Sequence, residues 1–160
     1  MKRIYLIRHG RAEDYQGGRH DSDADRRITP EGRDECAEVA KKLRKLDDKI
    51  EIVLTSPLRR AQETAEIFAQ KLGIEVEVSS ELEPPMAPGR LLQKLRRRAE
   101  RKLILVGHEP GLGLTVASWL GARAHVSPMK KCGIARLEIS DVENEPAELT
   151  WFAPPEIFTI

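Results

Sequence analysis

The chain has 160 residues, 40% of them hydrophobic, which is enough for one domain with a substantial core. Its 27 basic and 26 acidic side chains leave a formal net charge of +1, so no general attraction to nucleic acid is expected. No apolar run reaches the roughly 18 residues of a membrane span, and the apolar stretch after Lys2 and Arg3 is too short for a signal peptide, so we expect a cytoplasmic protein that binds no membrane.

The first part of the chain alternates short apolar runs with helical patterns. Residues 4–7 are apolar and precede Arg8-His9-Gly10, which is typical of a buried strand that ends in a turn. The charged residues 11–28 predict a long loop, a kind of segment that is often functional. Thr29-Pro30 and Ser56-Pro57 each place a capping residue before a proline, and this pattern predicts the start of two helices.

The rest of the chain continues the alternation of strands and helices. A basic amphipathic helix is predicted over Arg90–Lys102, and its arginines form either a solvated face or a docking patch for an acidic partner. The alternation favours one α/β domain over residues 1–160, a three-layer sandwich with a mainly parallel sheet and helices on both faces. Further strands are predicted at residues 50–54, 74–78, 103–106, 134–139 and 148–152, and a buried helix at 111–120.

Three of the predicted strands are followed by residues that suit a phosphate group. Arg8 and His9 follow the first strand, His108 follows another, and Ser56 opens the segment that carries Arg60. Ligands of open parallel sheets bind beyond the carboxyl ends of the strands, so we expect these groups in one crevice. Arginine side chains and helix N-termini both bind tetrahedral oxyanions, which makes phosphate the expected ligand.

The patterns that would indicate a metal ion fail at required positions. His108-Glu109 begins like H-E-x-x-H, but Leu112 occupies the place of the second histidine. Residues 21–25 begin like a calcium loop, but Arg26 occupies the glycine position and Gly32 the place of the bidentate glutamate. We therefore expect no metal site and no cofactor.

Three segments together resemble the histidine phosphatase superfamily, whose fold is phosphoglycerate-mutase-like. They are Arg8-His9-Gly10, the segment SPLRRAQET at residues 56–64, and Gly107-His108, in this order and each at a predicted strand end. The resemblance covers residues 2 to 120 or so. The short chain and the segment at residues 23–32 make it most similar to the small SixA-like phosphohistidine phosphatases.

The resemblance implies a role for each matching residue. His9 is expected to be the nucleophile that accepts the phosphoryl group, and Arg8 and Arg60 are expected to clamp it. His108 aligns with the second imidazole of the pocket and, if protonated, would add positive charge where other enzymes use a metal. Arg59 falls at a variable position and is expected to be a surface charge.

The resemblance leaves the proton donor open. Larger members carry a carboxylic acid after the third strand, but here Pro84 occupies that place, which leaves Glu83, one residue away, and Asp23 in the charged loop as candidates. Arg26 is expected near the anion, and Ser56 is expected to bind substrate or simply to cap a helix. A leaving imidazole can depart already protonated, so phosphohistidine is a substrate that needs little acid help.

These observations predict a metal-independent phosphatase that hydrolyses phosphohistidine on a protein through a covalent intermediate on His9. The expected partner is a phosphorylated protein, such as a histidine-containing phosphotransfer domain, or else a small phosphomonoester. Two alternatives stay open. One is a general small-molecule phosphomonoesterase of the same superfamily, and the other is a non-catalytic module that binds a phosphorylated ligand.

Overall fold

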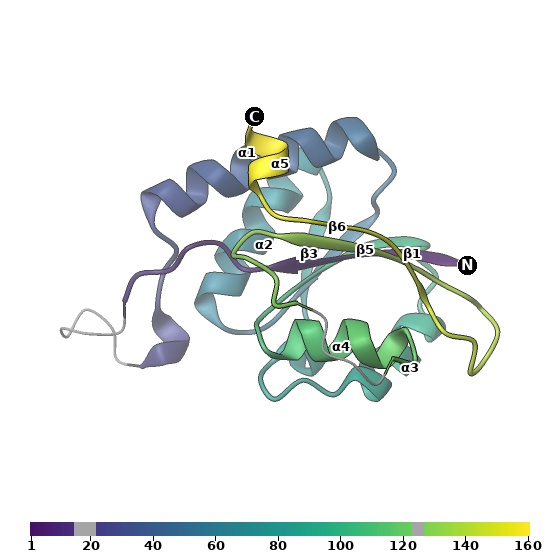
Figure 1. Cartoon of the computed structure of the whole chain (residues 1–160). Coiled ribbons are helices and arrows are strands. Elements are labelled where there is room, and N and C mark those ends of the chain that lie inside the picture. The colour runs from purple at the N-terminus through teal and green to yellow at the C-terminus, as the bar shows by residue number, and fades with distance from the viewer. Residues whose placement is uncertain (15–21, 123–126) are drawn as a thin grey trace.

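A six-stranded mixed sheet forms the middle layer of the computed structural model, which describes residues 1–14, 22–122 and 127–160 (Figure 1). The strand order is β3-β2-β4-β1-β5-β6; β3, β2, β4 and β1 are parallel, β5 pairs antiparallel with β1, and β6 pairs antiparallel with β5. The prediction of a mainly parallel sheet is confirmed. The strands are β1 (Lys2–Arg8), β2 (Ile52–Thr55), β3 (Glu75–Val78), β4 (Lys102–Gly107), β5 (Ile134–Ile139) and β6 (Glu148–Ala153).

Helices cover both faces of the sheet, as predicted. Figure 1 shows α1 and α5 on one side and α3 and α4 on the other, and α2 packs with α1. Within the described ranges, none of these helices combines the length and the apolar character that crossing a membrane requires. The helices are α1 (Pro30–Leu46), α2 (Arg59–Leu72), α3 (Pro88–Arg97), α4 (Gly111–Trp119) and α5 (Glu156–Thr159), with 3₁₀ turns at Asp23–Asp25 and Ser80–Leu82.

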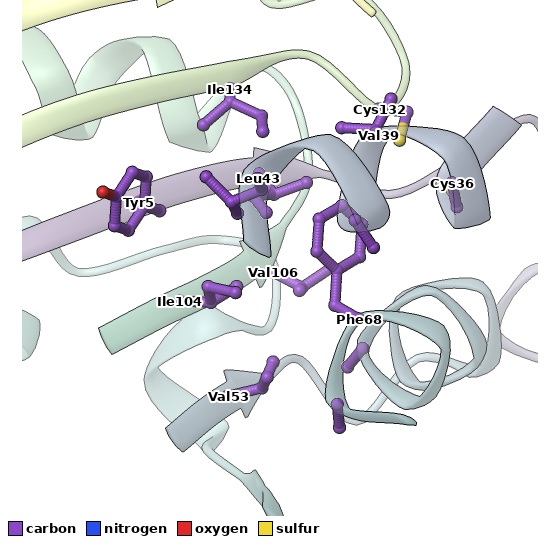
Figure 2. Packing of buried hydrophobic residues seen from close by; sticks show 14 of the residues in the cluster. Tyr5, Cys36, Val39, Leu43, Val53, Phe68, Ile104, Val106, Cys132 and Ile134 are labelled. Carbon is purple, nitrogen blue, oxygen red and sulfur yellow. The ribbon is translucent and has the colours of Figure 1, made fainter. Parts of the chain in front are cut away.

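Two apolar cores, one on each face, hold these layers together. Alternate residues of β1 point to opposite faces, so that Tyr5 and Ile7 join the core under α1 and α2 while Ile4 and Leu6 join the one under α3 and α4. Figure 2 shows Phe68 of α2 pointing toward the sheet, and this side chain is fully buried. The sheet is therefore buried on both faces, which explains the continuous apolar runs of its central strands.

The helix after β2 begins later than predicted. Thr29 caps α1 as expected, since its Oγ1 accepts a hydrogen bond from the Gly32 amide at 3.0 Å. In contrast, α2 starts at Arg59, because Leu58 has an extended conformation with φ −67° and ψ 138°. The Ser56 Oγ accepts a 3.2 Å hydrogen bond from the Leu58 amide. Ser56 therefore stabilises the turn before the helix instead of its first turn.

The predicted basic helix over Arg90–Lys102 is too long at its C-terminal end. The helix ends at Arg97, and Lys102 already belongs to β4. Arg98 leaves the helical conformation, with φ −78° and ψ 150°, and its guanidinium binds the carboxylates of Glu77 and Glu100 at 2.8–3.1 Å. This arginine is therefore neutralised within the chain and does not belong to an open basic face.

Candidate active site

Register within the parallel sheet brings three strand ends to one edge. Arg8 of β1 pairs with Gly107 of β4, and Thr55 of β2 pairs with Val106. The ladder continues past the strands, because the His9 amide donates to the Gly107 carbonyl at 3.1 Å and the Ser56 amide to Val106 at 3.0 Å. The residues that follow the strands therefore emerge side by side, as the parallel-sheet argument predicts.

The ring of His9 is buried and held in one tautomer. Its Nδ1 lies 2.7 Å from the carbonyl oxygen of Gly10, and because a carbonyl only accepts, Nδ1 must carry the hydrogen. The lone pair is then on Nε2. The ring centroid lies 5.2 Å from that of His108, so the two imidazoles face a common space.

The turn after His9 is fixed by Thr64, a residue whose role the sequence did not reveal. The Thr64 Oγ1 accepts a hydrogen bond from the Gly10 amide at 2.9 Å and donates one to the Arg60 carbonyl at 2.8 Å. A side chain at Gly10 would collide with Cys36, since its Cβ would lie 2.7 Å from the Sγ atom. Both residues position the backbone that carries His9.

His108 is the second imidazole of the cluster, and it is 3% exposed. Its Nε2 lies 2.7 Å from the Oγ of Ser56, which places the predicted substrate-binding serine beside this ring. Its Nδ1 is buried and has no hydrogen-bond partner among the described residues. An anion in front of the ring would satisfy this nitrogen once it carries a proton.

Two arginines border the imidazoles. Arg8 donates from Nη1 to the Met129 carbonyl at 2.8 Å, and Arg60 donates from Nη1 to the Asp23 carbonyl at 3.0 Å. The Nε atoms of both side chains are buried without a partner in the described part of the chain. Because an unpaired buried donor is costly, these groups suit an incoming oxyanion.

The charged loop places Asp23 and Arg26 at the rim. Arg26 donates from Nε to the Asp23 carboxylate at 2.8 Å, and Arg60 approaches the other carboxylate oxygen at 3.4 Å. Arg59, in contrast, pairs with Asp25 and Glu63 at 3.1 and 3.4 Å. Of the two neighbouring arginines, therefore, Arg60 points into the site and Arg59 lies outside it.

Glu83 is not joined to this cluster. Its side chain is exposed, and no hydrogen bond or ion pair of this carboxylate occurs among residues 1–14, 22–122 and 127–160. Asp23 is therefore the proton-donor candidate that the structure brings to the arginines, and Glu83 is the one that it does not.

Burial makes both imidazoles of the cluster neutral at pH 7. Desolvation lowers the pKa of His9 to about 3. Desolvation and the positive charge of Arg60 lower the pKa of His108 to about 4. In the ligand-free protein, therefore, His108 does not supply the positive charge that a protonated ring would add, because burial and the nearby arginines both disfavour that form. A bound phosphate dianion would favour the protonated ring again.

These pKa values predict an NMR titration. Between pH 7 and pH 5 the ring ¹⁵N shifts of His9 and His108, assigned with H9Q and H108Q variants, should stay at neutral values, whereas ordinary histidines titrate near 6.5. Inorganic phosphate should move the midpoint of His108 upward. The pKa of each histidine is lower in the folded protein than in the unfolded chain, so on acidification the unfolded chain takes up protons first. These histidines should therefore lower the free energy of unfolding as pH falls from 7 to 4. A midpoint near 6.5 for either ring without phosphate would contradict the assignment.

The donor set of the site suits an anion better than a cation. Arginine cannot bind a metal ion, and within the part of the chain that the structure describes no three His, Cys, Asp or Glu side chains are grouped so as to hold one. The arrangement can instead orient a tetrahedral oxyanion in front of the Nε2 of His9.

Comparisons with known proteins agree with this geometry. The chain is 39% identical over 139 residues to an uncharacterised protein of Picosynechococcus sp., covering 84% of this chain and 83% of that protein. It is 34% identical over 82 residues to a candidate phosphoserine phosphatase of Hydrogenobacter thermophilus, covering 51% of this chain and 39% of that one. The solved structure of the protein histidine phosphatase SixA with tungstate superposes with a TM-score of 0.82 at 27% identity, covering 97% of this chain and 98% of SixA.

The structural match identifies the α/β sandwich as phosphoglycerate-mutase-like, as predicted. The sequence profile of the histidine phosphatase superfamily, branch 1, matches residues 4–83, a range that includes most of β1, His9 directly after it, and α2 with Arg60. With this match, and with the matching motifs at three adjacent strand ends, the chain belongs to branch 1 of the histidine phosphatase superfamily.

Proposed function

We propose that this phosphatase removes phosphate from phosphohistidine on a protein by way of His9. The observation that carries the proposal is the fixed tautomer of His9, whose Nε2 lone pair faces a pocket of unpaired cationic donors. A binding module would need the donors but not a nucleophile held by Gly10 and Thr64. We therefore favour catalysis over the non-catalytic alternative.

In the first step the Nε2 of His9 attacks phosphorus, and the bond from phosphorus to the substrate nitrogen breaks. The leaving imidazole keeps the electron pair of that bond and carries a proton, so it departs neutral. In the second step water attacks phosphorus, the bond to His9 breaks, and inorganic phosphate leaves. The proton that the water loses passes to a phosphate oxygen, and the electron pair of the broken bond returns to the Nε2 of His9, which leaves the ring neutral.

Charge stabilisation in both steps would come from Arg8, Arg60 and His108. Phosphoryl transfer depends mainly on in-line positioning and on neutralising the equatorial oxygens. The two unpaired Nε donors are available for those oxygens, and His108 would add a third donor after it takes up a proton. Arg26 would contribute at the rim.

The choice of phosphohistidine rests on the carboxylates around the site: among the described residues none is hydrogen-bonded to His9, and that of Glu109, beside His108, already accepts two backbone hydrogen bonds. Pro84 occupies the place expected for an acid, and Glu83 contacts no residue of the site. We propose Asp23 as the group that assists proton transfer with poorer leaving groups, because it is the carboxylate that reaches Arg60. The overall likeness to SixA, at 27% identity, supports the same substrate class.

The test is a comparison of kcat/KM for a phosphorylated histidine-containing phosphotransfer domain, p-nitrophenyl phosphate and a phosphoserine peptide. We expect the phosphohistidine protein to be preferred at least tenfold, because an alkoxide leaves poorly without an acid. Equal values, or a preference for phosphoserine, would instead favour a small-molecule phosphomonoesterase. The match to the Hydrogenobacter protein is the observation that keeps this second function in view.

Activity should also survive removal of divalent ions. Dialysis against EDTA should leave kcat/KM for p-nitrophenyl phosphate unchanged within twofold, since the proposed charge stabilisation comes from arginine side chains. The measurement needs a metal-dependent phosphatase, treated in the same way, as its control. Loss of activity that one added divalent ion restores would refute the mechanism.

A further inference from the structure

A pocket of about 470 Å³ opens beside His108, between the loop that leads into α3 and the first turn of α4. Its volume lies in the range of ligand pockets. His108 belongs to the pocket wall, and its ring centroid lies 5.2 Å from that of His9, so the pocket adjoins the pair of imidazoles through this shared residue. Apart from His108, its side chains are mostly apolar: Pro84, Pro85, Pro88, Pro110, Met86 and Leu114.

The pocket offers almost nothing to a polar ligand. The carboxylate of Glu109, the one acidic residue among its described lining residues, already accepts hydrogen bonds from the Met129 amide at 3.1 Å and the Gly113 amide at 3.3 Å. Of the two ring nitrogens of His108, Nε2 is occupied by Ser56, and the unpartnered Nδ1 is the donor already assigned to the phosphoryl group. A sugar or a carboxylate placed here would lose its water without gaining partners, which makes such leaving groups unfavourable.

The walls of the pocket are formed before any ligand arrives. Met86 rests on the backbone at the start of α4, since a Cβ at Gly111 would lie 2.6 Å from its sulfur. The proline rings have little conformational freedom to lose. A preformed apolar pocket binds a matching group with a small entropic cost.

We propose that this pocket binds an apolar side chain that adjoins the phosphorylated residue of a protein substrate. The inference rests on the proposed function and extends it, because the imidazole of a phosphohistidine would fill only part of the pocket when the phosphoryl group lies against His9. Leu114, which is 51% exposed, is the wall residue that a neighbouring apolar side chain would cover.

The test compares L114E with the matched control L46E in the full-length protein. Both leucines are exposed helix residues, at 51% and 67%, so both variants should fold, and Leu46 lies at the end of α1, away from the pocket. The substrates are two phosphohistidine peptides that carry leucine or aspartate on either side of the phosphohistidine. Phosphoramidate, which has the same phosphorus–nitrogen bond but no side chain, completes the set.

We expect the wild type and L46E to prefer the leucine peptide about tenfold in kcat/KM, the scale of a small apolar contact. The L114E change should remove this preference and leave phosphoramidate unchanged within twofold. Equal use of both peptides by the wild type, or a loss in L114E that extends equally to phosphoramidate, would overturn the assignment.

A fourth substrate, 1-naphthyl phosphate, separates this inference from the proposed function. Turnover of 1-naphthyl phosphate but of neither peptide by the wild type would refute the proposed function. In that case an L114E loss limited to 1-naphthyl phosphate would still support an apolar leaving-group site, whereas an equal loss on phosphoramidate would overturn it.

Discussion

The H9A variant should lose at least 10⁴-fold in kcat, the scale seen when a covalent nucleophile is removed. The expectation follows from the Nε2 of His9, which is unprotonated above its low pKa of about 3 and faces the cationic donors of the site. Rapid quenching with ³²P-labelled substrate should trap acid-labile, base-stable label on the wild type and none on H9A. The label is the direct measure, because it reports the bond to His9.

The control for this experiment is H108A, which removes the second imidazole but keeps the nucleophile. This variant should turn over slowly and still carry the label. The thermal stability of both variants should be measured alongside their activity, because each histidine is more than nine-tenths buried and its removal can destabilise the fold. Full turnover by H9A, or label that persists on it, would show that another residue accepts the phosphoryl group.

The second large effect is expected at Arg60. Replacing this arginine by alanine should cost 10²–10³ in kcat/KM, the range for loss of one preorganised donor to a developing charge. Its side chain is buried, its Nη atoms contact Asp23, and its Nε has no partner among the described residues, so this N–H is available to the ligand. The R60K variant should recover little, because lysine lacks the planar pair of donors.

Arg59 is the matched control for Arg60. It is the neighbouring residue on the same helix, but it pairs with Asp25 and Glu63 at the surface, where solvent screens ion pairs strongly. The R59A variant should therefore change kcat/KM by less than threefold. Similar losses in R59A and R60A would mean that the wrong arginine has been placed in the site.

Much of the fold could be predicted because its central strands are buried on both faces and appear as continuous apolar runs. The runs around Leu6 and Leu105 therefore located β1 and β4, and the adjacent histidines located the site. The predicted convergence needed only the rule that parallel strands end at the same edge of the sheet.

What could not be predicted depends on contacts between distant segments. The start of α2 depends on the Ser56 hydroxyl, which is hydrogen-bonded to both the Leu58 amide and the Nε2 of His108. The end of α3 depends on Arg98, which pairs with a glutamate of β3. Neither the start of α2 nor the end of α3 could therefore be predicted from the helix propensities of the residues around it.

The site shows the same division between motif and context. The motifs singled out Arg8 and Arg60. They did not show that the Met129 carbonyl accepts a hydrogen bond from Arg8, or that the Asp23 carboxylate contacts Arg60. The neutral state of His108 is likewise a property of burial, which a sequence pattern does not carry. The contact between the proline-rich segment at residues 84–88 and α4, which creates the pocket, was not predicted.

The hydrogen bond from the Nδ1 of His9 to the Gly10 carbonyl also determines which isomer of the intermediate can form. With Nδ1 occupied, phosphate can attach only at the other nitrogen, which gives τ-phosphohistidine, also called 3-phosphohistidine. Antibodies that distinguish the two isomers should therefore stain the trapped enzyme in the 3-phospho channel alone. The regiochemistry of a covalent intermediate thus follows from the direction in which one backbone carbonyl points.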